Sequence, residues 1–264
     1  MRIVRFMDPA GHVTLGEPID ARTARRLRGE LFGRLEPTNE TVTIGRMLPP
    51  VDPPNVFAIG LNYRAHAAEG GFAIPDEPLV FLKATTSVIA DGEPIVLPKS
   101  APDEVDYEAE LAIVIGKSCR NVSEAQAPGY ALGYTCANDV SARDCQIRRD
   151  KQWARAKSFD TFCPLGPVLV TGDAINPDDR PIRSLLNGKV MQDSNTSDLI
   201  FSTAKLISYL SHQFTLRPGT VILTGTPGGV GVARKPPVFL RPGDTIVVQI
   251  DGIGELANTV VAEK

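Results

Sequence analysis

The chain has 264 residues, of which 42% are hydrophobic, so it can bury a substantial core within one large β-rich domain. Its formal net charge is −3 and its 28 lysines and arginines are dispersed, which argues against a nucleic-acid-binding protein. No stretch approaches the roughly 20 apolar residues of a membrane-spanning helix. The N-terminus lacks the apolar core of a secretory signal and no cysteines form a CxxC pair, so we expect a cytoplasmic protein with reduced thiols.

Residues 1–50 are predicted to form a small N-terminal domain that ends in a proline-rich linker. Within it, residues 2–6 and 12–15 are expected to pair as short strands around a turn at 8–11. The segment 48–54 is too rich in proline for a regular helix or a central strand. A second, catalytic domain is therefore expected over residues 51–264.

This larger part contains short apolar runs separated by many of the 23 glycines and 22 prolines of the chain, a pattern typical of short strands joined by tight turns. Strands are predicted at 56–61, 79–82, 110–115, 131–137, 167–170, 182–187 and 220–223, and a hairpin at 246–250 and 255–261. Helices are predicted at 63–69, at 140–149, and from Thr196 or Ser197 to Phe214. The sequence predicts a β-rich α+β fold with a closed or rolled sheet.

Three carboxylates form the first candidate site. Glu108 and Glu110 are one residue apart at the start of the apolar run 111–115, so on a strand both side chains point to the same face. Two like charges at the mouth of a core strand need a cation, and oxygen ligands without histidine favour Mg²⁺, Mn²⁺ or Ca²⁺. With Asp139 they are a candidate metal site. The alternative is that both glutamates lie at a solvated edge and Asp139 caps the predicted helix 140–149.

A histidine and a carboxylate form the second candidate site. His66 and Glu69 are three residues apart on the predicted helix 63–69 and can share one face of it. A carboxylate beside a histidine fixes its tautomer and raises its basicity, as a general base requires. The alternative is a surface pair that contributes a few tenths of a kcal/mol to helix stability.

Several polar side chains are candidates for binding an anionic substrate. Arg143 lies four residues after Asp139, on the same side of the predicted helix, and Gln146 lies one turn further along. Lys157 and Lys83 follow predicted buried segments. An anion beside a metal needs such cations, although each is more often a solvated surface charge.

A glycine-rich loop, residues 224–231, follows the predicted strand 220–223. Its backbone N–H groups can be presented to a carboxylate. It contains neither a phosphate-loop motif nor GxGxxG, and the chain has no Gly-x-Ser-x-Gly elbow, which excludes a serine hydrolase of that type. The alternative is a plain loop that ends a strand.

Taken together, these segments resemble the fumarylacetoacetate hydrolase family from about Val56 to the C-terminus. The resemblance is carried by six motifs in order: GLNYRAHAAE (60–69), FLK (81–83), DYEAEL (106–111), NDVSARD (138–144), KSFD (157–160) and TGTPGGVG (224–231). Residues 1–47 also resemble the small N-terminal domain of many bacterial and archaeal members.

The resemblance implies a mixed β-roll or barrel catalytic domain, a homodimer, and a bound Mg²⁺ or Mn²⁺ ion. The positions that match the family's metal carboxylates are Glu108, Glu110 and Asp139. Those that match its base dyad and site lysine are His66, Glu69 and Lys157. Those that match substrate-contacting positions are Arg143, Gln146 and Thr226.

The family chemistry implied is hydrolysis of a C–C bond in an acylpyruvate-like 2,4-dioxo acid, through a pyruvate enolate that the metal stabilises. Three alternatives remain open: decarboxylation of oxaloacetate, isomerisation of the 2-hydroxyhepta-2,4-diene-1,7-dioate or 5-carboxymethyl-2-hydroxymuconate type, and a non-enzymatic metal-bound protein that binds a small acid. All four imply a small anionic 2-oxo acid as the partner, and neither a nucleic acid nor a membrane.

Overall fold

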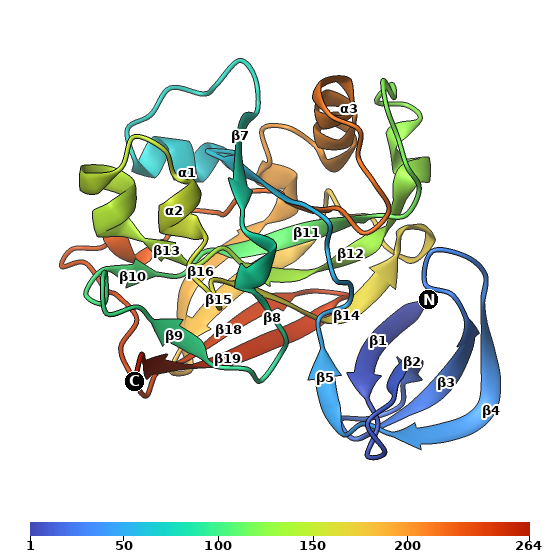
Figure 1. Cartoon of the computed structure of the whole chain (residues 1–264). Helices are drawn as coiled ribbons and strands as arrows, with labels where there is room; N and C mark the ends of the chain where they lie inside the picture. Colours follow the sequence, from blue (N-terminus) through green and yellow to red (C-terminus); the bar gives the residue numbers. More distant parts are fainter.

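A 12-stranded mixed sheet runs through the computed structural model, which describes residues 1–264 (Figure 1). Its strands lie in the order β4 (Leu35–Thr43), β3 (Thr23–Gly29), β2 (Val13–Pro18), β1 (Arg2–Met7), β14 (Cys163–Thr171), β12 (Ala131–Asn138), β11 (Ala109–Ile115), β17 (Val221–Leu223), β6 (Val56–Gly60) and β7 (Leu79–Lys83). Two short strands pair off this path, β5 (Arg46–Leu48) with β1 and β8 (Val88–Ile89) with β14. The predicted β-rich class is confirmed, but the sheet is open and forms no closed barrel.

Two smaller sheets complete the β structure. A five-stranded sheet has the order β16 (Lys189–Asn195), β15 (Pro181–Leu186), β18 (Thr245–Ile250), β19 (Gly254–Ala262) and β9 (Ile95–Leu97). A two-stranded sheet pairs β10 (Val105–Asp106) with β13 (Ser141–Ala142). The hairpin of β18 and β19 confirms the one predicted from the sequence.

The strands of the first 50 residues extend the main sheet. Strands β1 and β2 pair antiparallel, as predicted, and β1 also pairs with β14. Ile3 and Leu27 share a buried cluster with Leu165 and Leu169 of β14, so the N-terminal strands pack on the rest of the chain. In Figure 1 these strands, coloured blue, gather at one end of the molecule.

Strand β11 is buried along its whole length because both of its faces are covered. On one face Leu111, Ile113 and Ile115 belong to a cluster that also contains residues of β18 and of helix α3 (Thr203–Gln213). On the other face Ala112 and Val114 pack in a second cluster. This explains why its sequence reads as a continuous apolar run and not as an alternating pattern.

Few helices accompany the sheets. They are α1 (Arg64–Glu69), α2 (Ala154–Lys157) and α3, with a π-helical turn at Cys145–Arg149. Short 3₁₀ turns lie at Thr85–Ser87, Ala127–Tyr130, Gly172–Ala174, Thr196–Asp198 and Gly231–Ala233. No helix combines the length and the apolar character needed to span a membrane. The predicted helix at 63–69 is confirmed as α1.

The predicted helix over 140–149 is confirmed only from Arg143 onward, and its first three residues are not helical. Ser141 and Ala142 form strand β13 and pair with Asp106 and Val105, so the backbone after Asp139 is extended. Arg143 and Asp144 are helical and lead into the π-helical turn Cys145–Arg149. Asp144, not Asp139, accepts a hydrogen bond there, from the Cys145 N–H at 2.8 Å. Cross-strand pairing and burial override the local helical pattern here.

The predicted start of the long helix is also wrong, although its end is right. Asn195 caps only the short turn Thr196–Asp198, by accepting a hydrogen bond from the Ser197 N–H at 2.8 Å. Leu199 then bridges to Tyr63 in extended conformation, which separates this turn from α3. The N-cap of α3 is Ser202, whose hydroxyl accepts from the Lys205 N–H at 3.2 Å.

We expect Ile113→Ala to lower the free energy of unfolding by about 2–5 kcal/mol, because Ile113 is fully buried at the centre of β11 and its loss leaves a cavity. Urea unfolding followed by circular dichroism measures this change. Val190→Ala is the control: Val190 lies on β16 and is 46% exposed, so its loss should change the free energy by no more than about 0.5 kcal/mol. Equal effects at both positions would contradict the packing described.

Candidate active site

Strands β11 and β12 bring the three predicted metal carboxylates together. Ala109 pairs with Asn138 in their antiparallel register, and the Asp139 N–H donates to the Glu108 carbonyl at 2.9 Å. Glu108 and Asp139 therefore flank the paired strands, and Glu110 lies on β11. All three side chains are buried, and one ligand oxygen from each lies within 4.8 Å of the others. The shared face predicted for Glu108 and Glu110 is observed.

Three cationic side chains neutralise most of this negative charge. Lys157, at the end of α2, places Nζ 2.8 Å from Glu108 Oε2 and 2.7 Å from Asp139 Oδ2. Lys83, at the end of β7, pairs with Asp139 Oδ1. Arg143 Nη2 lies 2.8 Å from Glu108 Oε1. The compensation that the sequence argument assigned to a metal alone is thus shared with side chains.

The pKa values of Glu108, Glu110 and Lys157 shift in different directions because these charged groups are buried together. Burial alone would raise the pKa of Glu108, but Lys157 and Arg143 outweigh it and lower that pKa to about 2. Burial raises the pKa of Glu110 well above its usual value, and the charges of Asp139 and Glu108 raise it further. Burial would lower the pKa of Lys157, but Asp139 and Glu108 outweigh it and raise that pKa.

Glu110 is the carboxylate with the least compensation. Its hydrogen bond comes from the Gly225 N–H at 2.6 Å, and it forms no ion pair with a side chain. With three buried carboxylates and no histidine or cysteine, the donor set fits a hard divalent cation such as Mg²⁺ or Mn²⁺. A cation held there would relieve the repulsion among Glu110, Asp139 and Glu108.

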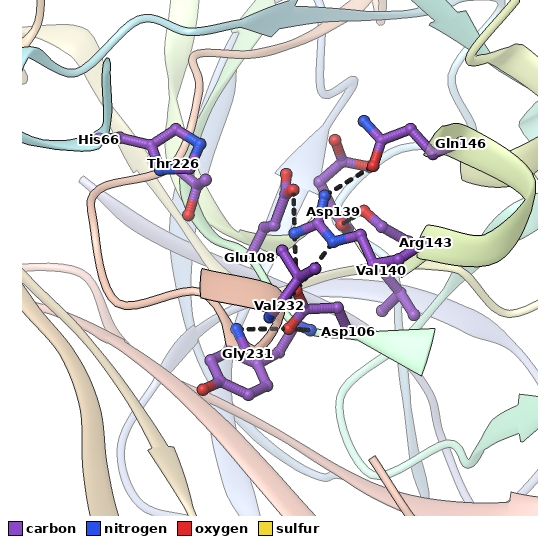
Figure 2. Close-up of polar contacts among 12 residues, drawn as sticks. His66, Asp106, Glu108, Asp139, Val140, Arg143, Gln146, Thr226, Gly231 and Val232 are labelled. Carbon is purple, nitrogen blue, oxygen red and sulfur yellow. Dashed lines mark hydrogen bonds and ion pairs between the residues drawn. The ribbon is translucent and has the colours of Figure 1, made fainter. Parts of the chain in front are cut away.

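Arg143 reaches the site from a strand and its following turn, and not from a helix shared with Asp139. Its guanidinium group lies between three acceptors, as Figure 2 shows. Nε donates to Asp106 Oδ2 at 2.8 Å, Nη1 donates to Gln146 Oε1 at 2.7 Å, and Nη2 contacts Glu108. The structure therefore brings Arg143 and Gln146 together beside the carboxylates.

The predicted dyad lies on α1. His66 Nδ1 is 3.5 Å from Glu69 Oε2 and forms no hydrogen bond, so the two groups are in contact but not bonded. The Glu69 carboxylate accepts from the Gly229 N–H, which is 3.0 Å from both oxygens. Hydrogen bonds between catalytic groups are often long without substrate and shorten when it binds. The pair thus has the spacing of a dyad that is not yet closed.

The glycine-rich loop binds the protein's own carboxylates. Its N–H groups at Gly225, Gly229 and Gly231 donate to Glu110, Glu69 and Asp106, respectively. All three positions need glycine: Gly225 and Gly229 have φ +101° and +98°, and a Cβ on Gly231 would lie 2.5 Å from Asp106 Oδ1. The loop does present N–H groups to carboxylates, and these carboxylates belong to the protein itself.

Most predicted site residues lie either in the wall of one cavity or buried beneath it, whereas Glu69 is exposed on α1. The cavity has a volume of about 360 Å³, and its polar lining consists of His66, Glu108, Arg143, Gln146, Lys157 and Thr226. Glu110, Asp139, Lys83 and Glu69 are not part of that lining. Lys83 is buried and paired with Asp139, so it supports the carboxylates from below.

The other wall of the cavity is apolar and was not found from the sequence. It includes Phe72, Leu79, Ile147 and Trp153. Trp153 packs so closely against the end of β6 that a Cβ on Gly60 would lie only 2.7 Å from its ring. No sequence pattern marks these residues, since they come from three separate segments.

Sequence reasoning also missed three polar side chains that hold the site. Asp106 binds Arg143, Asn138 Oδ1 accepts from the Glu108 N–H at 3.0 Å, and Gln192 Oε1 accepts from the Ala109 N–H at 2.9 Å. Gln192 also donates to Thr226 Oγ1 at 2.8 Å. Asp106 and Asn138 are the first residues of the motifs at 106–111 and 138–144, which was a usable signal, whereas Gln192 lies on the distant strand β16 and carried none.

Comparison with known proteins identifies the family. The model of the fumarylacetoacetate (FAA) hydrolase C-terminal family matches residues 55–261, so the chain belongs to this family. The chain is 48% identical over 220 residues to the mitochondrial oxaloacetate tautomerase of Xenopus laevis, which covers 83% of this chain and 69% of that protein.

Solved structures agree over the whole chain. The 5-carboxymethyl-2-hydroxymuconate delta-isomerase of Mycobacterium smegmatis is 42% identical with a TM-score of 0.87, and 100% of each chain is covered. The fumarylacetoacetate hydrolase of Exiguobacterium antarcticum is 35% identical with a TM-score of 0.89, again covering 100% of each chain. Relatives of this chain therefore carry the names of isomerases as well as hydrolases.

We expect Glu110→Gln to weaken Mg²⁺ or Mn²⁺ binding by more than the roughly 10- to 100-fold that loss of an outer-shell partner costs. The reason is that Glu110 is the carboxylate without a cationic side-chain partner, while glutamine keeps an acceptor for the Gly225 N–H. Isothermal titration calorimetry measures the affinity. Because the metal-free protein buries this carboxyl group without a cationic partner, replacing it with a neutral amide should not lower the melting temperature.

Glu36→Gln is the matched control, since Glu36 lies on β4 and is paired with Arg34. It should bind the metal like the wild type. Unchanged metal affinity in Glu110→Gln would show that the three carboxylates do not form the metal site.

Proposed function

We propose that this member of the fumarylacetoacetate hydrolase family is a divalent-metal-dependent isomerase that interconverts the keto and enol forms of a small 2-oxo acid, with oxaloacetate as the first substrate to test. The observation that carries the proposal is one cavity that is lined by a single histidine and by a buried carboxylate and lysine. Relatives named as an oxaloacetate tautomerase and a hydroxymuconate isomerase, at 48% and 42% identity, support it.

Keto–enol interconversion moves one proton between a carbon atom and the oxygen of the carbonyl group next to it. It therefore needs positive charge near the oxygen and a group that takes and returns a proton near the carbon. A divalent ion bound by Glu108, Glu110 and Asp139 would supply Lewis-acid polarisation of the oxygen atoms of the acid. Every further requirement must be met by side chains of the cavity.

Lys157 provides fixed positive charge at the polar wall. Its ammonium group is 2% exposed and held by two carboxylates, so it cannot turn away when substrate binds. Since its neighbours raise its pKa, the group stays protonated and donates hydrogen bonds to an oxygen that gains negative charge. This role needs no movement of α2.

His66 is the proposed proton carrier. It is the histidine of the cavity, and its Nδ1 lies 3.5 Å from the Glu69 carboxylate. Closing that gap would fix Nδ1 as the protonated nitrogen and leave Nε2 to take the proton. One imidazole is sufficient, because the same nitrogen can return the proton to the carbon or pass it to the oxygen.

Arg143 and Gln146 are proposed to bind the carboxylate of the substrate. Arg143 Nη1 holds Gln146 Oε1, which leaves the Gln146 amide nitrogen free to donate into the cavity that it lines. The planar guanidinium group suits a carboxylate. The homodimer implied by the family resemblance and the cytoplasmic location expected from the sequence stay predictions.

We expect His66→Ala to lower the rate of oxaloacetate tautomerisation by about 10²- to 10⁴-fold, because a positioned general base is lost. The ultraviolet absorbance of the enol, followed with and without Mg²⁺, measures the rate. Metal affinity should be unchanged, and Glu69→Gln should show a smaller loss, because it keeps a polar partner for His66 but removes its charge.

His212→Ala is the control, since His212 lies on α3 and bonds to the Ser208 carbonyl at 2.8 Å. It should tautomerise oxaloacetate at the wild-type rate. If His66→Ala retains full activity, the proton is carried by another group and the proposed mechanism is wrong.

Hydrolysis of an acylpyruvate is the second candidate, favoured by the proximity of His66 and Glu69, since a histidine with a carboxylate can activate water. We expect the enzyme to accelerate oxaloacetate tautomerisation in a Mg²⁺-dependent manner and to release little pyruvate from acetylpyruvate. A coupled assay for pyruvate, run on acetylpyruvate and on oxaloacetate, separates hydrolysis and decarboxylation from isomerisation. Faster pyruvate release than tautomerisation would replace the isomerase proposal.

A further inference from the structure

Asp106 is a buried carboxylate outside the predicted site, yet it joins three parts of it. It lies on β10, is fully buried, and is absent from the cavity lining. Its Oδ2 accepts from Arg143 Nε at 2.8 Å and contacts Nη2 at 2.8 Å. Its two oxygens also accept from the N–H groups of Gly231 at 2.8 Å and Val232 at 3.0 Å, as Figure 2 shows in part.

Every partner of Asp106 is a donor. Besides Arg143 and the loop, the Tyr107 N–H donates to Oδ1 at 2.8 Å. A carboxylate accepts all of these bonds at once, whereas the amide of asparagine would turn an N–H₂ group toward another donor in either orientation. The site therefore requires a charged aspartate and not only a side chain of that size.

The close approach of the loop to Asp106 is also specific. A Cβ on Gly231 would meet Val238 O at 1.9 Å and Asp106 Oδ1 at 2.5 Å, so only glycine allows this contact. The same loop bonds to Glu110 through Gly225. Asp106 thus ties the loop that supports a metal carboxylate to the arginine of the cavity.

Arg143 is held in position because several acceptors share its guanidinium group. Asp106 occupies the Nε edge of the guanidinium group, so Glu108 receives only Nη2 and Gln146 receives Nη1. Without Asp106 the nearest buried anion is Glu108, and a guanidinium group forms two parallel bonds with a free carboxylate. Arg143 would then turn toward Glu108, away from Gln146 and from the cavity.

We infer that Asp106 is a positioning residue, which acts through Arg143 to hold the substrate-binding face of the site. The role assigned to Arg143 rests on the proposed function, but the contacts of Asp106 do not. Because Asp106 does not line the cavity, it acts on a bound acid only through its neighbours. This predicts that substitutions of Asp106 and Arg143 are not additive.

Binding of oxalate at saturating Mg²⁺ provides a readout that needs no turnover. Oxalate is a planar dicarboxylate that imitates the carboxylate and neighbouring oxygen of a 2-oxo acid enolate. Trp153 is the one tryptophan of the chain and lines the cavity, so its fluorescence reports oxalate binding. We expect Asp106→Asn to weaken oxalate binding, and kcat/KM for oxaloacetate, by about 10- to 100-fold.

The double-mutant cycle decides between positioning and mere structural support. In an Arg143→Gln background, Asp106→Asn should change oxalate affinity by less than about threefold, because the residue it positions is gone. Asp178→Asn is the matched control: Asp178 accepts from the Thr203 N–H at 2.9 Å at the start of α3 and is not part of the cavity lining. It should lower the melting temperature and leave oxalate affinity unchanged.

Two results would overturn the inference. The first is an Asp106→Asn protein with a lower melting temperature but wild-type oxalate affinity, and the second is full additivity with Arg143→Gln. If Asp106→Asn does not fold, Asp106→Glu tests the same cycle, because it keeps the charge and displaces the carboxylate by one methylene group. A wild type that binds oxalate but isomerises no 2-oxo acid would refute the proposed function and leave the binding cycle to decide on Asp106.

Discussion

The burial of four carboxylates beneath one cavity is the constraint on which the rest of the site depends. Asp106, Glu108, Glu110 and Asp139 are all buried, and they face only three cations, Lys83, Arg143 and Lys157. Burying charge without compensation is costly, so each cation must be held in place, and the one negative charge in excess makes a divalent ion favourable. The antiparallel register of β11 and β12 enforces the crowding, and α2, β7 and the turn after β13 supply the cations.

The glycine-rich loop links the buried carboxylates to the rest of the cavity through hydrogen bonds. Through single N–H groups it holds a metal carboxylate, the partner of the proposed base, and Asp106. A shift of the loop would therefore disturb all three functions together, and Gln192 opposes such a shift by donating to Thr226 Oγ1 and to the Pro227 carbonyl, both at 2.8 Å. The loop therefore supports the candidate site through the protein's own carboxylates.

The sequence was sufficient for what depends on local pattern and failed where long-range pairing decides. The spacing of Glu108 and Glu110 on an apolar run correctly placed both on one face of a strand. Residues 140–149 carry a helical pattern, but pairing of β13 with β10 extends the backbone up to Ala142, and only the structure reveals that pairing. Gln192 and Trp153 could not be found either, because their roles arise from contacts between segments distant in sequence.

The apolar wall bears on the choice between isomerisation and hydrolysis. Phe72, Ile147 and Trp153 are apolar members of the cavity lining and offer water few hydrogen bonds, although Phe72 and Ile147 are 58% and 59% exposed. Hydrolysis needs a water molecule positioned between His66 and the substrate carbonyl, whereas tautomerisation needs only contact between the imidazole and the acid. The same charged floor can support both reactions, and the access of water beside His66 is the physical variable that separates them.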